Sequence, residues 1–227
     1  MSAQLVLLFV VASALLFKRF RERPRRPWNV WGMDISKQAC SGGAGHAVGM
    51  TVAILAHIYS KGASECGWYF VVYFADCTIG LALAITFHKV FTGLAAHGRL
   101  TAQLAGDKGH AAAWWDALVE IGNYGDPPQV RRWMIQVVFW MSCVVTARVI
   151  VGCIVVSSIP VLSIVTDALD DHFEGHPEVF LFTVMVAIPV VVNVGQAWIQ
   201  DQVLKWSHRQ TKEHRGSPRV HTDGEHA

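Results

Sequence analysis

Residues 133–156 read WMIQVVFWMSCVVTARVIVGCIVV, and this stretch decides the fold class of the chain. As a helix it is long enough to cross the roughly 30 Å hydrocarbon core of a bilayer. Its only charged residue is Arg148. Further apolar runs, separated by charged stretches, cover residues 3–17, 38–59, 68–91 and 179–199. The pattern predicts an all-α, polytopic transmembrane helical bundle of about five spans.

The composition agrees with a membrane protein. Of the 227 residues, 52% are hydrophobic and only 16% are charged, whereas a soluble domain carries about 25% charged residues. The formal net charge of +2 is too small to favour nucleic-acid binding. We therefore expect the lipid bilayer as a partner and no nucleic acid.

The charges between the apolar runs set the expected orientation. Residues 18–37 hold the highest density of Lys and Arg, and the loop at 93–132 and the tail from residue 205 are also basic. The loop at 157–178 has five acidic residues and no Lys or Arg. Because basic loops stay in the cytosol, this alternation predicts a cytosolic C-terminus.

The first apolar run, residues 3–17, has two interpretations. Ala12-Ser13-Ala14 resembles a signal-peptide cleavage site, but the expected positive charges follow the apolar run instead of preceding it. We expect an uncleaved anchor whose N-terminus lies outside the cytosol. If the run were cleaved, four spans would remain and the C-terminus would still be cytosolic.

Other segments receive predictions of their own. Within the loop at 93–132, residues 111–121 predict a short helix that lies in the membrane interface or packs on the ends of the bundle. Residues 1–204 are expected to form the bundle, and the polar tail 205–227 is expected to be disordered. Pro189 removes a backbone hydrogen bond from the last span and predicts a kink.

Two charged residues lie deep inside predicted spans. Asp76 and Arg148 each lie about eight residues from the non-cytosolic end of a span, or about 12 Å deep at 1.5 Å per residue. Charges at such depth are costly and tend to be functional. An ion pair would pin two helices together, or line an ion pathway or gate a conformational change. The two side chains could also fail to meet.

A second matched set of polar residues lies nearer the cytosolic side. His46 and Asn193 are expected to form a cross-helix hydrogen bond, which is typically worth about 0.6 kcal/mol. In the second span, small residues recur every four positions and predict the close approach of another helix. They are Ser41, Gly45, Gly49 and Ala53.

No motif of catalysis or cofactor binding occurs in the sequence. It has no nucleotide-binding loop, nucleophile elbow or HExxH motif. The five cysteines form no CxxC pair and no zinc-site spacing. We expect no enzymatic activity, no cofactor and no bound metal.

The basic segment after the first run also predicts a contact surface. Clustered basic residues beside a span attract anionic lipid headgroups, at about 1 kcal/mol each near the surface. Orientation alone would also explain these charges. The candidates for contact with lipid or a protein partner are Lys18, Arg19, Arg21, Arg23 and Arg25.

Several short motifs follow one another in the chain. The first comprises Arg26, Pro27, Trp28, Trp31, Asp34, Ser36, Lys37 and Gln38. Those that follow include Asp76, Tyr124, Gly125, Asp126, Pro127, Gln136, Asn193 and Asp201. In their order and spacing they resemble the STIMATE family, the STIM-activating enhancers, which includes fungal vacuolar membrane proteins. The likeness extends over about residues 17–205.

The resemblance implies a non-enzymatic protein of the endoplasmic reticulum or another endomembrane. Animal members promote store-operated calcium entry at contacts between that membrane and the plasma membrane, by helping the STIM calcium sensor change conformation. A STIM-like calcium sensor is therefore an implied partner. The chain departs from the family pattern at Ala147, where animal members have an acidic residue, and at Gly49, where they have Asn. Its tail is also shorter.

Three functions remain open at this point. The first is a regulator or scaffold at endomembranes that contacts anionic lipid and a protein partner. The second is a small ion or solute transporter or channel that uses Asp76 and Arg148. The third is a structural subunit of a membrane complex, which the small-residue stripe of the second span favours if it faces another chain.

Overall fold

A computed structural model describes residues 2–23, 25–59, 65–106, 109–173 and 175–216, which form helices and turns and contain no β-strand. The elements in chain order are α1 (Ser2–Arg21), α2 (Trp28–Tyr59), α3 (Glu65–Ala75), the π-helical turn η1 (Asp76–Gly80), α4 (Leu81–Leu104), α5 (His110–Val119), α6 (Val130–Ser157), α7 (Ile159–Phe173), α8 (Pro177–Phe182), the π-helical turn η2 (Thr183–Ala187) and α9 (Ile188–Gly216).

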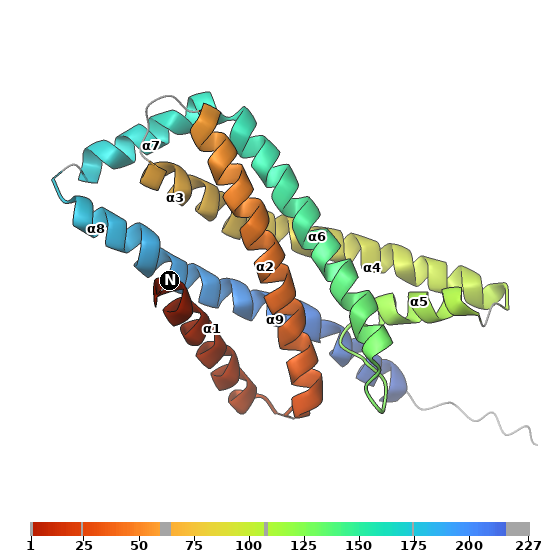
Figure 1. The fold of residues 1–227 in the computed structure, drawn as a ribbon. Helices are drawn as coiled ribbons and strands as arrows, with labels where there is room; N and C mark the ends of the chain where they lie inside the picture. The colour runs from red at the N-terminus through yellow and green to blue at the C-terminus, as the bar shows by residue number, and fades with distance from the viewer. Residues whose placement is uncertain (1, 24, 60–64, 107–108, 174, 217–227) are drawn as a thin grey trace, which may run out of the picture.

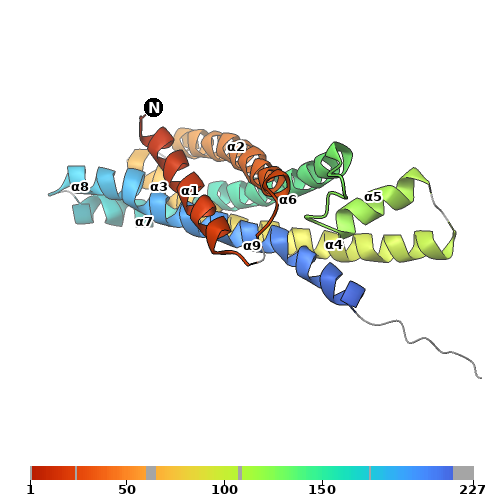
Figure 2. The ribbon, with the colours of Figure 1, turned by 90° about the horizontal axis from the view of Figure 1, so that it is seen from below.

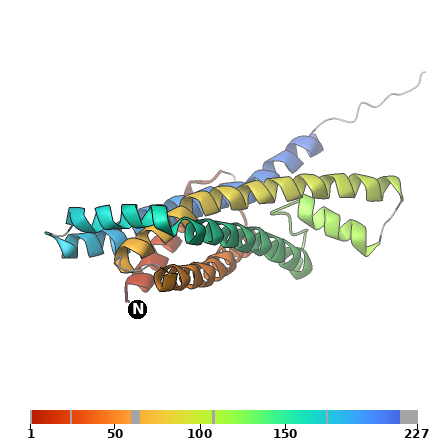
Figure 3. The ribbon, with the colours of Figure 1, turned by 90° about the horizontal axis from the view of Figure 1, so that it is seen from above.

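The long helices pack side by side in an elongated bundle (Figures 1 and 2). Helix α2 makes its most extensive contact with α6, and α1 lies along α9. The view from above shows α2 beside α6, and α4 with α5 folded back on it (Figure 3). One end of the bundle therefore gathers the C-terminal end of α1 and the N-terminal ends of α2 and α6.

Three helical segments of the described residues are long and apolar enough to cross a membrane. They are Gly67–Leu104, Val130–Ser157 and Glu178–Leu204. The predicted spans at 68–91, 133–156 and 179–199 lie inside them. The predicted spans at 3–17 and 38–59 lie in α1 and α2 but are not among the three, so the count of five stays a prediction.

The helix that holds the third predicted span extends beyond it. Helix α4 continues to Leu104, so the segment expected to be a loop from residue 93 begins with three more helical turns. Helix α5 lies where a short helix was expected and packs on α4. Gly98 permits this close approach, because a Cβ there would lie 3.1 Å from the ring of Trp115. Whether α5 lies in the membrane interface stays a prediction.

Two further boundaries differ from the prediction. The acidic segment at 157–178 is mostly helix α7 and not a loop. Helix α9 continues to Gly216 and so includes residues 205–216 of the predicted tail, whose disorder stays a prediction, and residues 217–227 lie outside the described part of the chain. At Pro189, the chain forms the π-helical turn η2 just before the proline, where the hydrogen-bond pattern of the α-helix changes.

The interface between α2 and α6 explains the small residues of α2. The indole N–H of Trp140 donates to Ser41 Oγ (3.1 Å), and the guanidinium of Arg148 covers Gly45. Further along, Val52 fills the space over Gly152. The stripe was predicted to admit another helix, and at these positions that helix is α6 of the same chain.

Candidate functional site

Six of the motif residues meet in one buried network, together with Lys18 of α1 and Glu22, which follows α1. We call this network the end cluster, since it lies where α1, α2, α6 and α9 come together. Its members are Lys18, Glu22, Arg26, Asp34, Lys37, Tyr124, Gln136 and Asp201. It has three cationic and three anionic side chains, so its charges balance.

Arg26, between α1 and α2, binds three carboxylates. Its guanidinium donates to Glu22 Oε2 (3.0 Å), Asp34 Oδ2 (2.7 Å) and Asp201 Oδ1 (2.9 Å). Burial lowers the pKa of Arg26, but the charges of the carboxylates outweigh burial and hold the pKa above its usual value. A permanently charged, planar donor group suits this position, because it can serve three acceptors at once.

Asp34 on α2 accepts from three different parts of the chain. Besides Arg26, Lys37 Nζ lies 3.4 Å from Oδ1, and the Tyr124 hydroxyl donates to Oδ1 at 2.5 Å. Burial and the charge of Asp34 raise the pKa of Tyr124 well above its usual value, so the phenol keeps the proton that it donates. Asp34 is 2% exposed, so these contacts replace nearly all of its hydration.

Gln136 of α6 connects the cluster to the segment after α5. Its Oε1 accepts from Lys37 Nζ (3.2 Å) and from the backbone N–H of Gly122 (3.1 Å). Its Nε2 donates to the carbonyl oxygens of Ala117 (3.1 Å) and Glu120 (3.2 Å). The amide therefore satisfies backbone groups where α5 ends, at a turn in which Gly122 has a φ of 83°.

Asp201 fastens α1 to α9. Lys18 Nζ lies 2.8 Å from Asp201 Oδ2 and also donates to the carbonyl oxygen of Trp198 (2.9 Å). On the other side of the carboxylate is Arg26. Because Arg26 also binds Asp34, the end of α1 and the start of α2 are held at one depth of α9.

The basic residues predicted to contact lipid or a partner fall into two groups. Lys18 and Arg19 are engaged within the chain: Arg19 is buried, its guanidinium lies 3.3 Å from the ring centroid of Trp28, and it donates to the carbonyl oxygen of Arg26. Contact of these two residues with lipid or a partner stays a prediction. The other group, Arg21, Arg23 and Arg25, is exposed at the same end of the bundle.

The remaining motif residues surround the cluster. Ser36 accepts from the indole N–H of Trp133 (3.1 Å), and Gln38 is buried. Pro27 begins the turn into α2, where the rings of Trp28 and Trp31 meet edge to face. Residues 125–128 form a turn in which Gly125 has a φ of 88°, a conformation that favours glycine. Asp126 and Pro127 are exposed in this turn.

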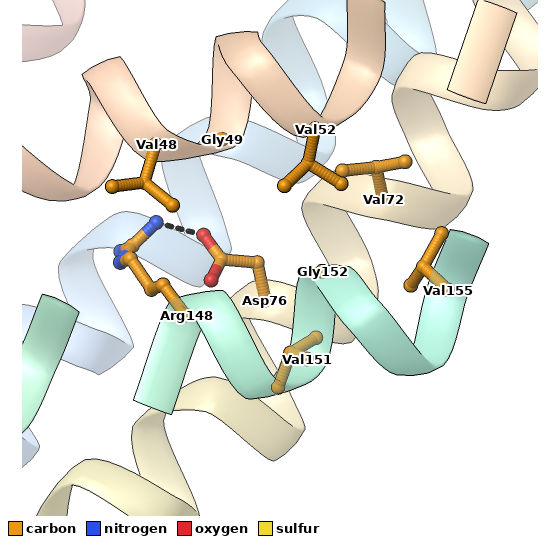
Figure 4. A pocket seen from close by; sticks show the side chains of 9 residues that line it. All are labelled: Val48, Gly49, Val52, Val72, Asp76, Arg148, Val151, Gly152 and Val155. Carbon is orange, nitrogen blue, oxygen red and sulfur yellow. Dashed lines mark hydrogen bonds and ion pairs between the residues drawn. The ribbon is translucent and has the colours of Figure 1, made fainter. Parts of the chain in front are cut away.

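The predicted ion pair is present. Arg148 Nη1 binds Asp76 Oδ2 and also donates to the carbonyl oxygen of Gly45 (3.3 Å), as Figure 4 shows for the two side chains. Glycines make the room: a Cβ at Gly45 would collide with the guanidinium, and one at Gly80 would lie 3.0 Å from Asp76 Oδ1. The pair therefore occupies space that larger residues would close.

A small cavity adjoins the pair. Valines of α2, α3 and α6 line it, with Asp76 and Arg148 at one end (Figure 4). Its interior offers about 10 Å³ to the centre of a water molecule, which is about the room that one water needs. In this conformation the cavity admits no larger solute.

The structure does not bring His46 and Asn193 together. The amide of Asn193 donates to Tyr73 Oη (2.8 Å) and to the carbonyl oxygen of Pro189 (2.8 Å), while His46 is exposed on α2. The predicted pair was based on matched depth alone, and the faces of the two helices differ. His88 of α4 is buried between Phe139 and Trp140.

Sequence reasoning missed several partners. Lys18 and Glu22 were assigned to the surface or to no role, although the spacing of Glu22 and Arg26 is that of an i, i+4 ion pair. Tyr73 and Gly80 carried no signal that ties them to Asn193 and Asp76. Among the described residues, no group of three or more His, Cys, Asp or Glu side chains could hold a metal ion.

Comparison with known proteins gives one family. The sequence model described as the STIMATE family matches residues 66–206, more than half of the chain, and confirms the resemblance inferred from the motifs. The match includes Tyr124, Gln136 and Asp201 of the end cluster, whose partners Arg26 and Asp34 precede it. No solved structure matches the chain.

Proposed function

Since the chain belongs to the STIMATE family, we propose that it is a non-enzymatic, multi-pass regulator of store-operated calcium entry at contacts between an endomembrane and the plasma membrane. Its partners are anionic lipid headgroups and a STIM-like calcium sensor. Membership of the family supports a membrane regulator of calcium signalling, and the end cluster supports the more specific proposal.

The topology that we propose has five spans, with α1 and α2 as the first two. Helix α1 has 20 residues, or about 30 Å at 1.5 Å per residue, which equals the thickness of the hydrocarbon core. The burial of Leu15 and the Lys18–Asp201 contact favour a retained α1. The basic end of the bundle then faces the cytosol, and so does the C-terminus.

The observation that carries the proposal is the exposure of Arg21, Arg23 and Arg25 on a connection whose neighbours are fixed. Glu22 and Arg26 alternate with these arginines and are buried in the end cluster. The connection is therefore held at a defined depth while three cations point outward. Such an arrangement suits contact with an anionic leaflet, at about 1 kcal/mol per cation near the surface.

The test replaces the exposed arginines together. Arg21→Gln, Arg23→Gln and Arg25→Gln in one chain should leave the folded protein intact and reduce its enrichment at contact sites at least threefold, as measured by fluorescence microscopy after store depletion. Lys89→Gln, at an exposed position of α4, is a control for loss of one positive charge elsewhere on the chain. Unchanged enrichment of the triple variant would contradict the role of these arginines.

A second candidate function is ion transport, which the Asp76–Arg148 pair and its adjoining cavity favour. Purified protein in liposomes decides between the two. Flux of protons or calcium that Asp76→Asn abolishes would support transport, and absence of flux would leave the regulator. The third candidate, a subunit of a membrane complex, loses its main support, because Ser41 and Gly45 face α6 of the same chain.

A further inference from the structure

The inward-facing residues of the third predicted span have a spacing that a regular α-helix does not accommodate. Buried residues lie at every fourth position through α3, η1 and α4, namely Trp68, Val72, Asp76, Gly80, Ala84 and His88, and Val71, Cys77 and Leu81 are buried beside this stripe. In an α-helix a step of four residues turns the side chain by about 40° beyond a full circle. Over the five steps the stripe would turn by about 200°, away from α2 and α6.

The π-helical turn η1 corrects about half of this drift. A π turn holds one extra residue, which shifts the helix that follows by about 100° relative to an uninterrupted α-helix. Because η1 begins at Asp76, both Val72 on one side and Ala84 on the other face the interior. The extra residue therefore sets the direction in which Asp76 points.

Contacts around η1 hold this register. Asp76 binds Arg148 of α6, and Tyr73, one turn earlier, accepts from the amide of Asn193 on α9. The hydroxyl of Thr78 donates to the carbonyl oxygen of Phe74 (2.7 Å), a backbone group of the turn that precedes η1. Gly80 leaves room for the Asp76 carboxylate to lie over the next turn.

We propose that η1 is a register switch, for which the Asp76–Arg148 pair is the latch. Conversion of the π turn to regular α-helix would rotate α3 by one residue against α4. Each residue of α3 would then move out of its position and the next would replace it: Tyr73 would take the place of Val72, and Cys77 that of Asp76. The pair would open, and the cavity that Val72 lines would change shape (Figure 4).

The alternative register predicts a specific new contact. Val72 packs with Val151 and Val155 in a buried cluster. In the rotated state Tyr73 would lie against Val155 instead. Residues on α4 would keep their partners, such as Ala84 with Val144. A cross-link between positions 73 and 155 therefore reports the rotated state, and one between 84 and 144 is a control for the fold.

The experiment uses disulfide cross-linking of the full chain in native membranes, with the five native cysteines replaced and copper–phenanthroline as the oxidant. The pair Val72→Cys with Val155→Cys should cross-link in the parent chain. The pair Tyr73→Cys with Val155→Cys should cross-link weakly there and at least threefold faster when Asp76→Asn removes the latch. Arg148→Gln should have the same effect by removing the other partner.

Deletion of Ile79 tests the role of η1 most directly. It removes one residue from η1 at an exposed position and lets the segment become regular α-helix with α3 in its present orientation. The chain then has no extra residue to move, so the 73–155 cross-link should stay absent even with Asp76→Asn, while the 72–155 and 84–144 cross-links persist.

Two outcomes overturn the proposal. One is no increase of the 73–155 cross-link in either latch variant while the 84–144 cross-link still forms. The other is an equal increase with and without Ile79, which would indicate motion independent of η1. Cross-linking does not depend on calcium entry. A failed test of the register switch would therefore leave the proposed function unaffected, and the reverse also holds.

Discussion

The end cluster and the Asp76–Arg148 pair hold charged side chains inside the same bundle in two different ways. In the cluster, Arg26 serves three carboxylates and Asp34 accepts from three donors. In the pair, one carboxylate meets one guanidinium in space left by glycines. The cluster joins several helices through shared partners, whereas the pair joins two helices and can open in a single step.

The largest effect should follow from removing Arg26. Arg26→Met leaves Glu22, Asp34 and Asp201 without their shared cation, and an unpaired buried charge typically costs about 3–5 kcal/mol. We expect loss of the folded protein, measured as yield and thermal stability in detergent. Arg25→Met, at an exposed neighbouring position, should change stability by less than about 0.5 kcal/mol. Equal stability of the two variants would contradict the role of Arg26.

The pair should respond differently to single and double changes. Asp76→Asn or Arg148→Gln alone leaves one buried charge and should cost about 3–5 kcal/mol. Changing both to apolar residues, Asp76→Leu with Arg148→Met, should recover most of this loss, since no other charge depends on the pair. Asp34→Leu with Arg26→Met should not recover, because Asp201 and Glu22 remain. Thermal unfolding of these four variants and of Arg26→Met compares the two sites.

A smaller effect is expected at Tyr124. Tyr124→Phe keeps the buried ring and removes only the hydrogen bond to Asp34, and a bond to a charged group is worth about 1.5–3 kcal/mol. Phenylalanine cannot replace the donor, but Arg26 and Lys37 still neutralise Asp34. Thermal unfolding should show a stable fold with a lower midpoint. A midpoint equal to the parent's would mean that the hydroxyl contributes nothing.

The smallest effect tests the room around the pair. Gly45→Ala would place a methyl group against the Arg148 guanidinium and should cost about 1–3 kcal/mol, as overpacking does. Gly42→Ala, on an open part of the same helix, should instead stabilise by up to about 1 kcal/mol through helix propensity. If both substitutions stabilised equally, the space over Gly45 would not matter.

The sequence predicted the parts of the molecule that depend on local patterns. Long apolar runs indicated the helices, the small residues Ser41 and Gly45 indicated the contact with another helix, and matched depth indicated the Asp76–Arg148 pair. Depth along a span, however, does not say in which direction around the helix a side chain points. His46 and Asn193 also match in depth, yet the rotation of their helices keeps them apart.

The end cluster was harder to predict, because its members come from positions 18 to 201 and meet only after three helix ends converge on the middle of α9. The motif residues Arg26, Asp34, Tyr124 and Asp201 were visible, but nothing in their spacing showed that they contact one another. The register of η1 was also missed. The four-residue spacing from Trp68 to His88 was present in the sequence, but burial had to be known before the spacing had meaning.

The most direct test of the proposed function is calcium refilling after store depletion in cells that lack this protein. Such cells should refill at least twofold more slowly, and the wild-type chain should restore the rate. The variant Arg21→Gln, Arg23→Gln, Arg25→Gln should be expressed and folded but restore less than half of it. Refilling at the same rate with and without the protein would contradict the proposed role in store-operated calcium entry.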